Sequence, residues 1–225
     1  MNTYKNVLLL IGSPKGSAST SASLGNYLIS KLEENGLTKE VGYIHKLVKN
    51  KEGQLKLFSM IDKTDLIVMA FPLYVDSLPA PVIKSLEFIA DYRENLEHPR
   101  QQGFVIIINC GFPESEHNNT AVNISKIFAQ DVGFEWKGGL ALGMGGVIQG
   151  KPLKDRGGVV RNIIKGLDIA AIALSEGENI PQEAIDLVSK RMMPKKFYTM
   201  VGNIGWKMQA KKYGARKKMN EKPYL

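Results

Sequence analysis

Apolar residues cluster in short continuous runs along the first two-thirds of the chain instead of alternating with polar ones. The clearest runs are residues 7–11, 66–71 and 104–108, and a weaker one covers residues 140–142. Such runs are typical of strands that are covered on both faces, as in a parallel sheet. Residues 41–47 are interpreted as one more strand. The pattern therefore predicts a buried parallel sheet.

Helical patterns lie between these runs. Leu24, Leu28 and Leu32 recur every four residues after the first run. Apolar residues also repeat at helical spacing over residues 82–90 and, behind Asn118 as an N-cap, less regularly from residue 122 onward. Because strands and helices alternate, we expect right-handed crossovers and an open, doubly wound α/β sheet. Residues 91–102 are polar and are interpreted as a surface connector.

The last third of the chain is expected to be helical and to end in a basic extension. Helices are predicted over residues 159–174 and from Pro181 onward. The formal net charge is +8. Residues 194–225 contain nine basic residues and Glu221 as the sole acid, so residues 1–193 carry no net charge. We therefore divide the chain into a domain, residues 1–193, and a basic C-terminal extension, residues 194–225.

Three roles are open for this extension, in which residues 201–213 are expected to form a helix. It packs as an arm on the domain or on a dimer partner, it contacts an anionic surface, or it binds an acidic redox partner or nucleic acid. Lysines near acidic lipid contribute about 1 kcal/mol each, but the apolar side of the helix is narrow for stable insertion. The chain contains no base-reading motif that would support nucleic acid.

Composition excludes several classes of protein. A single cysteine, Cys110, excludes an internal disulfide framework and a cysteine-built metal cluster. The three histidines show no ligand spacing, and every apolar run is too short to span a bilayer. Residues 1–6 lack the layout of a secretory signal. We expect a cytoplasmic protein without a bound metal or a transmembrane segment.

A dense group of hydroxyl residues follows the first predicted strand: Ser13, Ser17, Ser19, Thr20, Ser21 and Ser23. Ligands of doubly wound sheets bind beyond the carboxyl ends of the strands, and the free N–H groups of a first helical turn attract phosphate. The spacing of Gly12 and Gly16 fits neither a Walker A loop nor a dinucleotide fingerprint. The segment is therefore either a phosphate loop or a polar connector in which Ser19 or Thr20 merely caps the helix.

Two further loops are expected to leave the same edge of the sheet. Residues 71–81 are aromatic, apolar and rich in proline, which suits the flat face of a ring system or a hydrophobic staple for the next helix. Residues 109–114 follow the next strand. A phosphate loop and two walls for a planar ring together describe a site for FMN.

These loops resemble those of the NAD(P)H-dependent FMN reductases, a family of flavodoxin-like flavoproteins. The similar stretches, in the expected order within residues 5–150, are residues 12–16 with 19–21, residues 72–74 with 77–79, and residues 111–114. The resemblance implies a flavodoxin-like doubly wound sheet of five parallel strands in the order 2-1-3-4-5, here with a C-terminal helical extension. It also implies non-covalently bound FMN, and homodimers are common in the family.

The match carries the family's cofactor contacts onto this chain. The FMN phosphate is expected to contact Ser13, Lys15, Ser19, Thr20 and Ser21. The isoalloxazine ring is expected to lie among Pro72, Leu73, Tyr74, Val75, Asp76, Ser77, Asn109, Cys110, Gly111 and Phe112. Some relatives also hold an iron–sulfur centre in a cysteine cluster, which the single cysteine of this chain excludes.

Other candidate residues are interpreted more simply. Cys110 is expected to be a small strand-end residue and not a redox thiol, and Glu114 and His117 are expected to be solvated. The glycine-rich residues 138–150 form either a lid beside the flavin or a flexible excursion. In the first case, the basic residues that follow, Lys151, Lys154 and Arg156, could meet a nicotinamide nucleotide phosphate.

The resemblance implies an enzyme that passes electrons from NAD(P)H through FMN to a small acceptor such as a quinone or a free flavin. Because the flavin itself accepts hydride, no catalytic side chain is assigned. A flavodoxin-type electron carrier is one alternative, although such carriers are typically shorter and acidic. A flavin-binding regulatory protein with a basic partner-binding tail is the other. The acceptor and the choice between NADH and NADPH are left open by the sequence.

Overall fold

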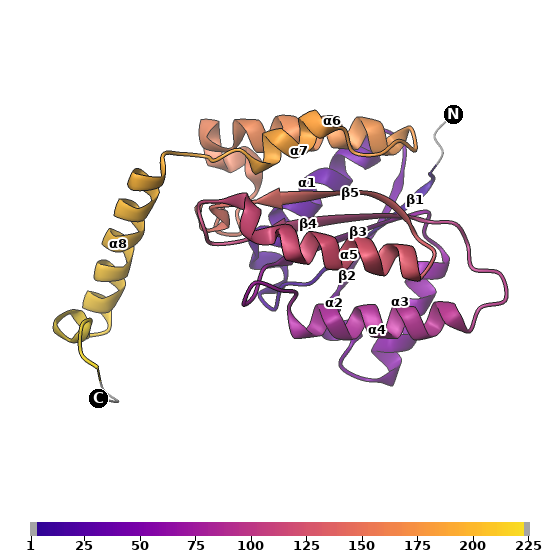
Figure 1. The fold of residues 1–225 in the computed structure, drawn as a ribbon, viewed down its shortest axis with the longest axis horizontal. Helices are drawn as coiled ribbons and strands as arrows, with labels where there is room; N and C mark the ends of the chain where they lie inside the picture. The colour runs from indigo at the N-terminus through magenta and orange to yellow at the C-terminus, as the bar shows by residue number, and fades with distance from the viewer. Residues whose placement is uncertain (1–3, 223–225) are drawn as a thin grey trace. The chain divides into compact units, whose positions relative to one another are not determined.

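The computed structural model describes residues 4–222, which form two compact units, one up to Arg191 and one from Met192 onward. The first unit is a five-stranded parallel sheet with helices on both faces (Figure 1). Its strand order is β2-β1-β3-β4-β5. The predicted flavodoxin-like α/β fold is therefore confirmed.

The strands are β1 (Asn6–Ile11), β2 (Thr38–Tyr43), β3 (Leu66–Pro72), β4 (Gly103–Asn109) and β5 (Glu135–Leu142). The three central strands are almost wholly buried because helices cover both of their faces. The predicted second strand was placed too late, since residues 44–47 are a helix and β2 begins at the exposed Thr38. β2 is an edge strand, so half of its residues meet water and it lacks a continuous apolar run.

The helices of this unit are α1 (Thr20–Glu34), α2 (Ile44–Leu47), α3 (Lys51–Asp62), α4 (Ala80–Glu94), α5 (Asn119–Asp131), α6 (Arg161–Ser175) and α7 (Gln182–Ser189). Short 3₁₀ helices are η1 (Gly16–Ala18), η2 (Ser115–Asn118), η3 (Gly145–Val147) and η4 (Leu153–Val160). Helices α1, α6 and α7 cover one face of the sheet, and α2 to α5 cover the other (Figure 1). Helix α3 was not predicted from the sequence, because it buries few of its residues and so lacks a clear apolar pattern.

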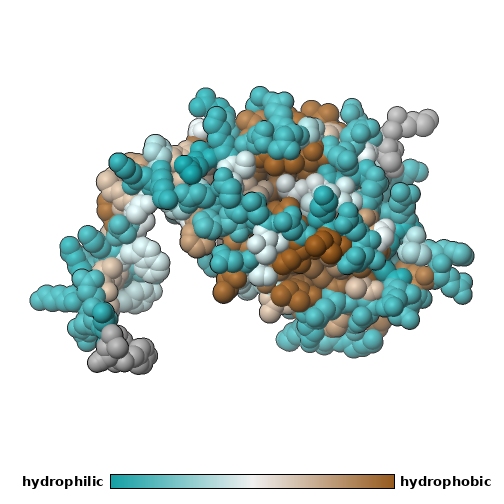
Figure 2. Space-filling model, viewed as in Figure 1, coloured by the Kyte–Doolittle hydropathy of each residue, from teal (hydrophilic) through white to brown (hydrophobic). Residues whose placement is uncertain are grey.

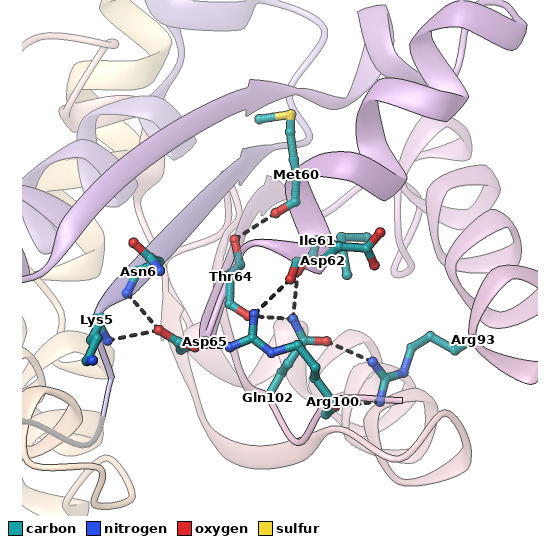
Figure 3. Close-up of polar contacts among 10 residues, drawn as sticks. All are labelled: Lys5, Asn6, Met60, Ile61, Asp62, Thr64, Asp65, Arg93, Arg100 and Gln102. Atoms are coloured by element: carbon teal, nitrogen blue, oxygen red, sulfur yellow. Dashed lines mark hydrogen bonds and ion pairs between the residues drawn. The ribbon is translucent and has the colours of Figure 1, made fainter. Parts of the chain in front are cut away.

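A buried polar network closes the amino ends of the strands (Figure 3). The Arg93 guanidinium donates to Gln102 Oε1 at 2.7 Å and to the Val132 carbonyl at 2.7 Å. Gln102 Nε2 donates in turn to the carbonyls of Ile61 and Thr64. The predicted surface connector, residues 91–102, is therefore wrong at both ends, because it begins inside α4 and ends on a buried glutamine.

The second unit contains α8 (Lys195–Lys212) and η5 (Arg216–Lys218). Helix α8 starts directly after Pro194, earlier than the predicted residues 201–213, and none of its described residues is buried.

In the first unit, Figure 2 shows an apolar area over α5, where Ile124 and Ile127 are exposed. Within residues 4–222, no helix combines the length and the apolar character needed to cross a membrane.

Candidate functional site

The register of the sheet brings the carboxyl ends of four strands side by side. Ile11 in β1 pairs with Ala70 in β3, Pro72 pairs with Asn109 in β4, and Asn109 pairs with Leu142 in β5. The loops after these strands therefore emerge at one edge. They enclose a cavity of about 440 Å³, a size that is typical of small-molecule sites.

The structure brings most of the predicted site residues to this cavity. Those that line it are Ser13, Lys15, Ser19, Thr20, Ser21, Pro72, Leu73, Tyr74, Asn109, Cys110 and Gly111. The lining does not include Val75, Asp76, Ser77 or Phe112, although they belong to the same loops. Five more residues line the cavity: Ala18, which was not predicted, and Gly145, Gly146, Gln149 and Gly150, which belong to the glycine-rich segment that was interpreted either as a lid beside the flavin or as a flexible excursion.

The hydroxyl residues at the start of α1 have distinct roles. Ser19 is the N-cap, since its Oγ accepts from the Ala22 amide at 3.1 Å and donates to the Gly16 carbonyl at 2.7 Å. Ser21 Oγ accepts from Asn109 Nδ2 at 2.8 Å, and among residues 4–222 its own hydroxyl hydrogen has no acceptor. The first-turn amides, including that of Ser21, also lack carbonyl partners inside the helix. The same loop therefore caps the helix and leaves hydrogen-bond donors beside the cavity.

Thr20 fixes the loop after β5, which forms a fourth side of the cavity. Its hydroxyl donates to the Gly145 carbonyl at 2.9 Å, which joins the start of α1 to the loop after β5. In the same loop, a side chain at Gly150 would collide with the Ala18 carbonyl. The Arg156 guanidinium donates to the Val147 carbonyl. The loop after β5 is thus packed against η1 and the start of α1 through its backbone.

This arrangement revises the interpretation of residues 138–150. Their first part is not a lid, since Gly138 and Gly139 belong to β5. Their last part borders the cavity. Lys151 and Lys154 are absent from its lining. The sequence signal for this side of the cavity was the glycine-rich segment at the end of β5. Its contacts with Ala18 and Thr20 are long-range and cannot be predicted from local spacing.

Another side of the cavity is formed by the loops after β3 and β4. Tyr74 lines the cavity and is 44% exposed. The amides and carbonyls of Tyr74 and Ser77 bond to each other at 2.9 and 3.0 Å, so a tight turn closes the loop. At Gly111, an added Cβ would meet no atom within 4 Å, because this backbone borders open space. The open space beside these apolar residues has room for the isoalloxazine ring of FMN. The donors at the start of α1 suit its phosphate.

The lone cysteine lines the cavity as a neutral thiol. Cys110 Sγ lies 3.5 Å from the Glu114 carbonyl and 3.5 Å from Asn118 Nδ2. Burial raises the pKa of the Cys110 thiol, which disfavours the thiolate that redox chemistry needs. Glu114 and His117 do not line the cavity; the His117 ring packs 4.3 Å from that of Phe112, centroid to centroid.

Comparison with known proteins identifies the fold. Neither a protein-family model nor a curated protein sequence matches the chain. A candidate quinone reductase from Klebsiella pneumoniae is 16% identical over 79% of this chain and 87% of its own, with a TM-score of 0.55. A flavone reductase is 11% identical over 77% of this chain and 65% of its own, with a TM-score of 0.58.

A third solved structure contains the expected cofactor. It is an FMN-dependent NADH-azoreductase from Bacillus anthracis in complex with FMN. It is 12% identical to this chain, covers 76% of it and 99% of its own length, and has a TM-score of 0.51. At such identities the likeness shows a shared fold. The chain is therefore a flavodoxin-like α/β protein, and its solved neighbours agree with the resemblance found in its loops.

Proposed function

We propose that this chain is an oxidoreductase that holds FMN in the cavity and passes electrons from NAD(P)H to a small acceptor such as a quinone or a flavin. The observation that carries the proposal is the convergence of the loops after β1, β3, β4 and β5 on one cavity. This cavity offers anion donors at one end and flat apolar residues at the other. Neighbours of the same fold whose names describe reductases support the assignment.

The phosphate of FMN would lie at the start of α1. Ser13 is 3% exposed yet lines the cavity, and the Ser21 hydroxyl is directed by its bond from Asn109. Lys15, also in the lining, adds a positive charge. Together with the first-turn amides and the helix dipole, these groups favour a dianionic phosphate monoester without a metal.

Asn109 would couple the two ends of the site. Its side-chain amide donates to Ser21 Oγ and to the Phe71 carbonyl, at 2.8 and 3.3 Å. It therefore fixes the phosphate loop relative to the loop after β3, which would contact the ring. When bound, FMN supplies the hydride-accepting chemistry, and the protein binds and orients it.

The surroundings of the cavity mouth suit an apolar, planar acceptor. Tyr74 and Phe112 are 44% and 49% exposed, and Val75 is 98% exposed. Exposed aromatic and aliphatic groups of this kind stack on flat rings and gain by covering apolar surface. A quinone or a second flavin therefore fits this mouth better than a highly charged acceptor does.

The test is a spectroscopic titration of the purified full chain. We expect a yellow protein, or a colourless one that takes up FMN with quenching of flavin fluorescence. Anaerobic NADH or NADPH should bleach the flavin, and a quinone should restore the colour. A flavin that binds but is not bleached by either nucleotide would instead identify an electron carrier. A chain that takes up no FMN would remove the proposal altogether.

A further inference from the structure

Helix α8 concentrates charge in a way that the flavin site does not use. The segment from residue 194 onward carries a formal charge of +8, equal to that of the whole chain. Five of its nine basic residues lie within α8 itself: Lys195, Lys196, Lys207, Lys211 and Lys212. Because the rest of the chain is neutral, this segment dominates long-range attraction to anionic partners.

The same helix carries an uncovered apolar stripe. Its members, at steps of three and four residues, are Phe197, Met200, Val201, Ile204 and Met208. Each is between 49% and 68% exposed. Trp206, 67% exposed, lies on the opposite side and is not part of the stripe. A row of large apolar groups in water calls for a surface that covers it.

Lysines border this stripe. Lys207 and Lys211 follow Ile204 and Met208 by three residues, so they lie along one edge of it. Lys212 follows Met208 by four residues and lies along the other edge. Long lysine stems can lie beside buried apolar groups while their ammonium groups stay in water. The helix therefore presents apolar groups between a row of lysines on one edge and Lys212 on the other.

This combination favours one kind of partner. A second copy offers no surplus of negative charge, because its first unit is neutral and its own α8 contains no acidic residue that could pair with the lysines. Nucleic acid would neutralise the charge but would leave the apolar stripe in water. The surface of an anionic bilayer satisfies both features, with lipid phosphates for the lysines and the headgroup boundary for the stripe.

We propose that α8 docks this protein on anionic phospholipid membranes, lying in the plane of the interface. The narrow stripe implies shallow, reversible binding in which charge supplies most of the affinity. The proposal is independent of the flavin: it would hold if the cavity bound no FMN, and the flavin proposal would hold if α8 bound no lipid.

The experiment is cosedimentation of the full-length protein with vesicles. We expect binding to vesicles of phosphatidylcholine mixed with phosphatidylserine, no binding to pure phosphatidylcholine, and release by salt. The triple variant Lys196→Glu, Lys207→Glu, Lys211→Glu should lower the partition coefficient by about 100-fold or more. Far-UV circular dichroism of each variant checks that the fold is retained.

Two matched controls separate this surface from net charge and general stickiness. Lys49→Glu, Lys56→Glu, Lys126→Glu makes the same change in net charge at exposed lysines of the first unit and should keep most of the binding. Val201→Gln with Ile204→Gln should weaken binding severalfold at fixed charge. Leu55→Gln with Ile172→Gln, which alters two similarly exposed apolar residues of the first unit, should leave it unchanged.

Each outcome decides the proposal. Loss of binding in the two α8 variants, with both controls intact, supports it. Equal loss in the Lys49, Lys56 and Lys126 variant would show unspecific charge attraction and overturn it. Failure of the wild-type chain to sediment with anionic vesicles would also overturn it, as would tighter binding to duplex DNA or to polyglutamate measured in the same buffer.

Discussion

Ser21 joins two parts of the candidate site at a single hydroxyl. Its oxygen accepts from the Asn109 side chain, and its hydrogen is left for a ligand in the cavity. We predict that Ser21→Ala weakens FMN binding by about 1–3 kcal/mol, because a hydrogen bond to a charged phosphate is lost. Fluorescence quenching of free FMN measures the change.

Ser17 provides the control for this prediction. It lies in the same loop, is exposed, and does not line the cavity. Ser17→Ala should therefore leave the FMN dissociation constant unchanged. Equal affinities for both variants and the wild-type chain would mean that the hydroxyl of Ser21 makes no contact with the cofactor.

Val75 is strained at the tip of the loop after β3. Its φ is +49° and that of Asp76 is +56°, the left-handed values of a two-residue hairpin turn in which asparagine and glycine are favoured. A β-branched residue is costly there, by about 1–2 kcal/mol. Val75→Asn should therefore raise the free energy of unfolding by about 1 kcal/mol, measured by urea denaturation.

Val75→Ala removes the branch at Cβ but keeps a side chain that disfavours positive φ. It should therefore stabilise the protein less than Val75→Asn does. No gain in stability from the asparagine would show that the turn relaxes around valine in solution. Because Val75 does not line the cavity, FMN affinity serves as an independent check that the site is intact.

At the scale of elements, the loop after β5 is positioned by close backbone packing on η1. Gly150 has a φ of +69° and lies against the Ala18 carbonyl, whereas Gly157 has a φ of +62° and open space around it. Alanine strains the backbone at both positions. Only Gly150→Ala also displaces the phosphate loop.

We therefore predict that Gly150→Ala lowers FMN affinity by at least about tenfold, or about 1.4 kcal/mol. Gly157→Ala should lower the free energy of unfolding and leave FMN affinity near that of the wild type. A flavin titration of each variant measures its dissociation constant for FMN. Equal FMN affinities would show that the loop after β5 moves independently of η1.

A hydrogen bond between α1 and α6 makes stability depend on alkaline pH. Tyr27 Oη donates to Asp168 Oδ1 at 2.9 Å. Burial, followed by this bond, raises the pKa of Tyr27 from 10.0 to about 12. The folded state thus holds the phenolic proton more tightly than the unfolded state does, so the contribution is complete below pH 10 and is lost as the pH approaches 12.

Tyr27→Phe should therefore cost about 1 kcal/mol near neutral pH, through the lost bond. The difference between the variant and the wild type should shrink between pH 10 and 12. Urea midpoints measured for both proteins across this range test the prediction. A difference that stays constant up to pH 12 would mean that Asp168 does not hold the proton of Tyr27.

The sequence predicted those elements whose burial is complete. β1, β3 and β4 are covered on both faces, so their positions were visible as apolar runs. β2 and α3 were misplaced or missed because each buries only part of its surface. Most of the residues that the family resemblance assigned to the site line the cavity. The side formed by the loop after β5 depends on the bond from Thr20 to Gly145, 125 residues away in the sequence. No local spacing encodes such a contact.

At the scale of the whole molecule, charge and burial are distributed in opposite ways. The first unit holds the buried core and has a formal net charge of zero, whereas the segment from residue 194 carries +8. The two units are each compact by themselves, and none of the described residues of α8 is buried. We therefore predict that breaking α8 does not unfold the first unit.

Two exposed isoleucines allow a matched test of this independence. Ile204 in α8 is 52% exposed and Ile172 in α6 is 55% exposed, so the two substitutions act at positions of similar exposure. Proline inside a helix costs about 3 kcal/mol or more. Ile172→Pro should lower the free energy of unfolding of the first unit by that amount, because α6 packs on α1 and α7.

Ile204→Pro should reduce helical circular dichroism yet leave both the main unfolding transition and FMN affinity unchanged. Circular dichroism measures the helix content, and differential scanning calorimetry with and without FMN measures the unfolding transition and its stabilisation by FMN. A comparable loss of stability in both variants would mean that the extension packs on the domain as a structural arm. Retained stability would mean that α8 does not stabilise the first unit, so that its lysines and its apolar stripe remain available to bind an external surface.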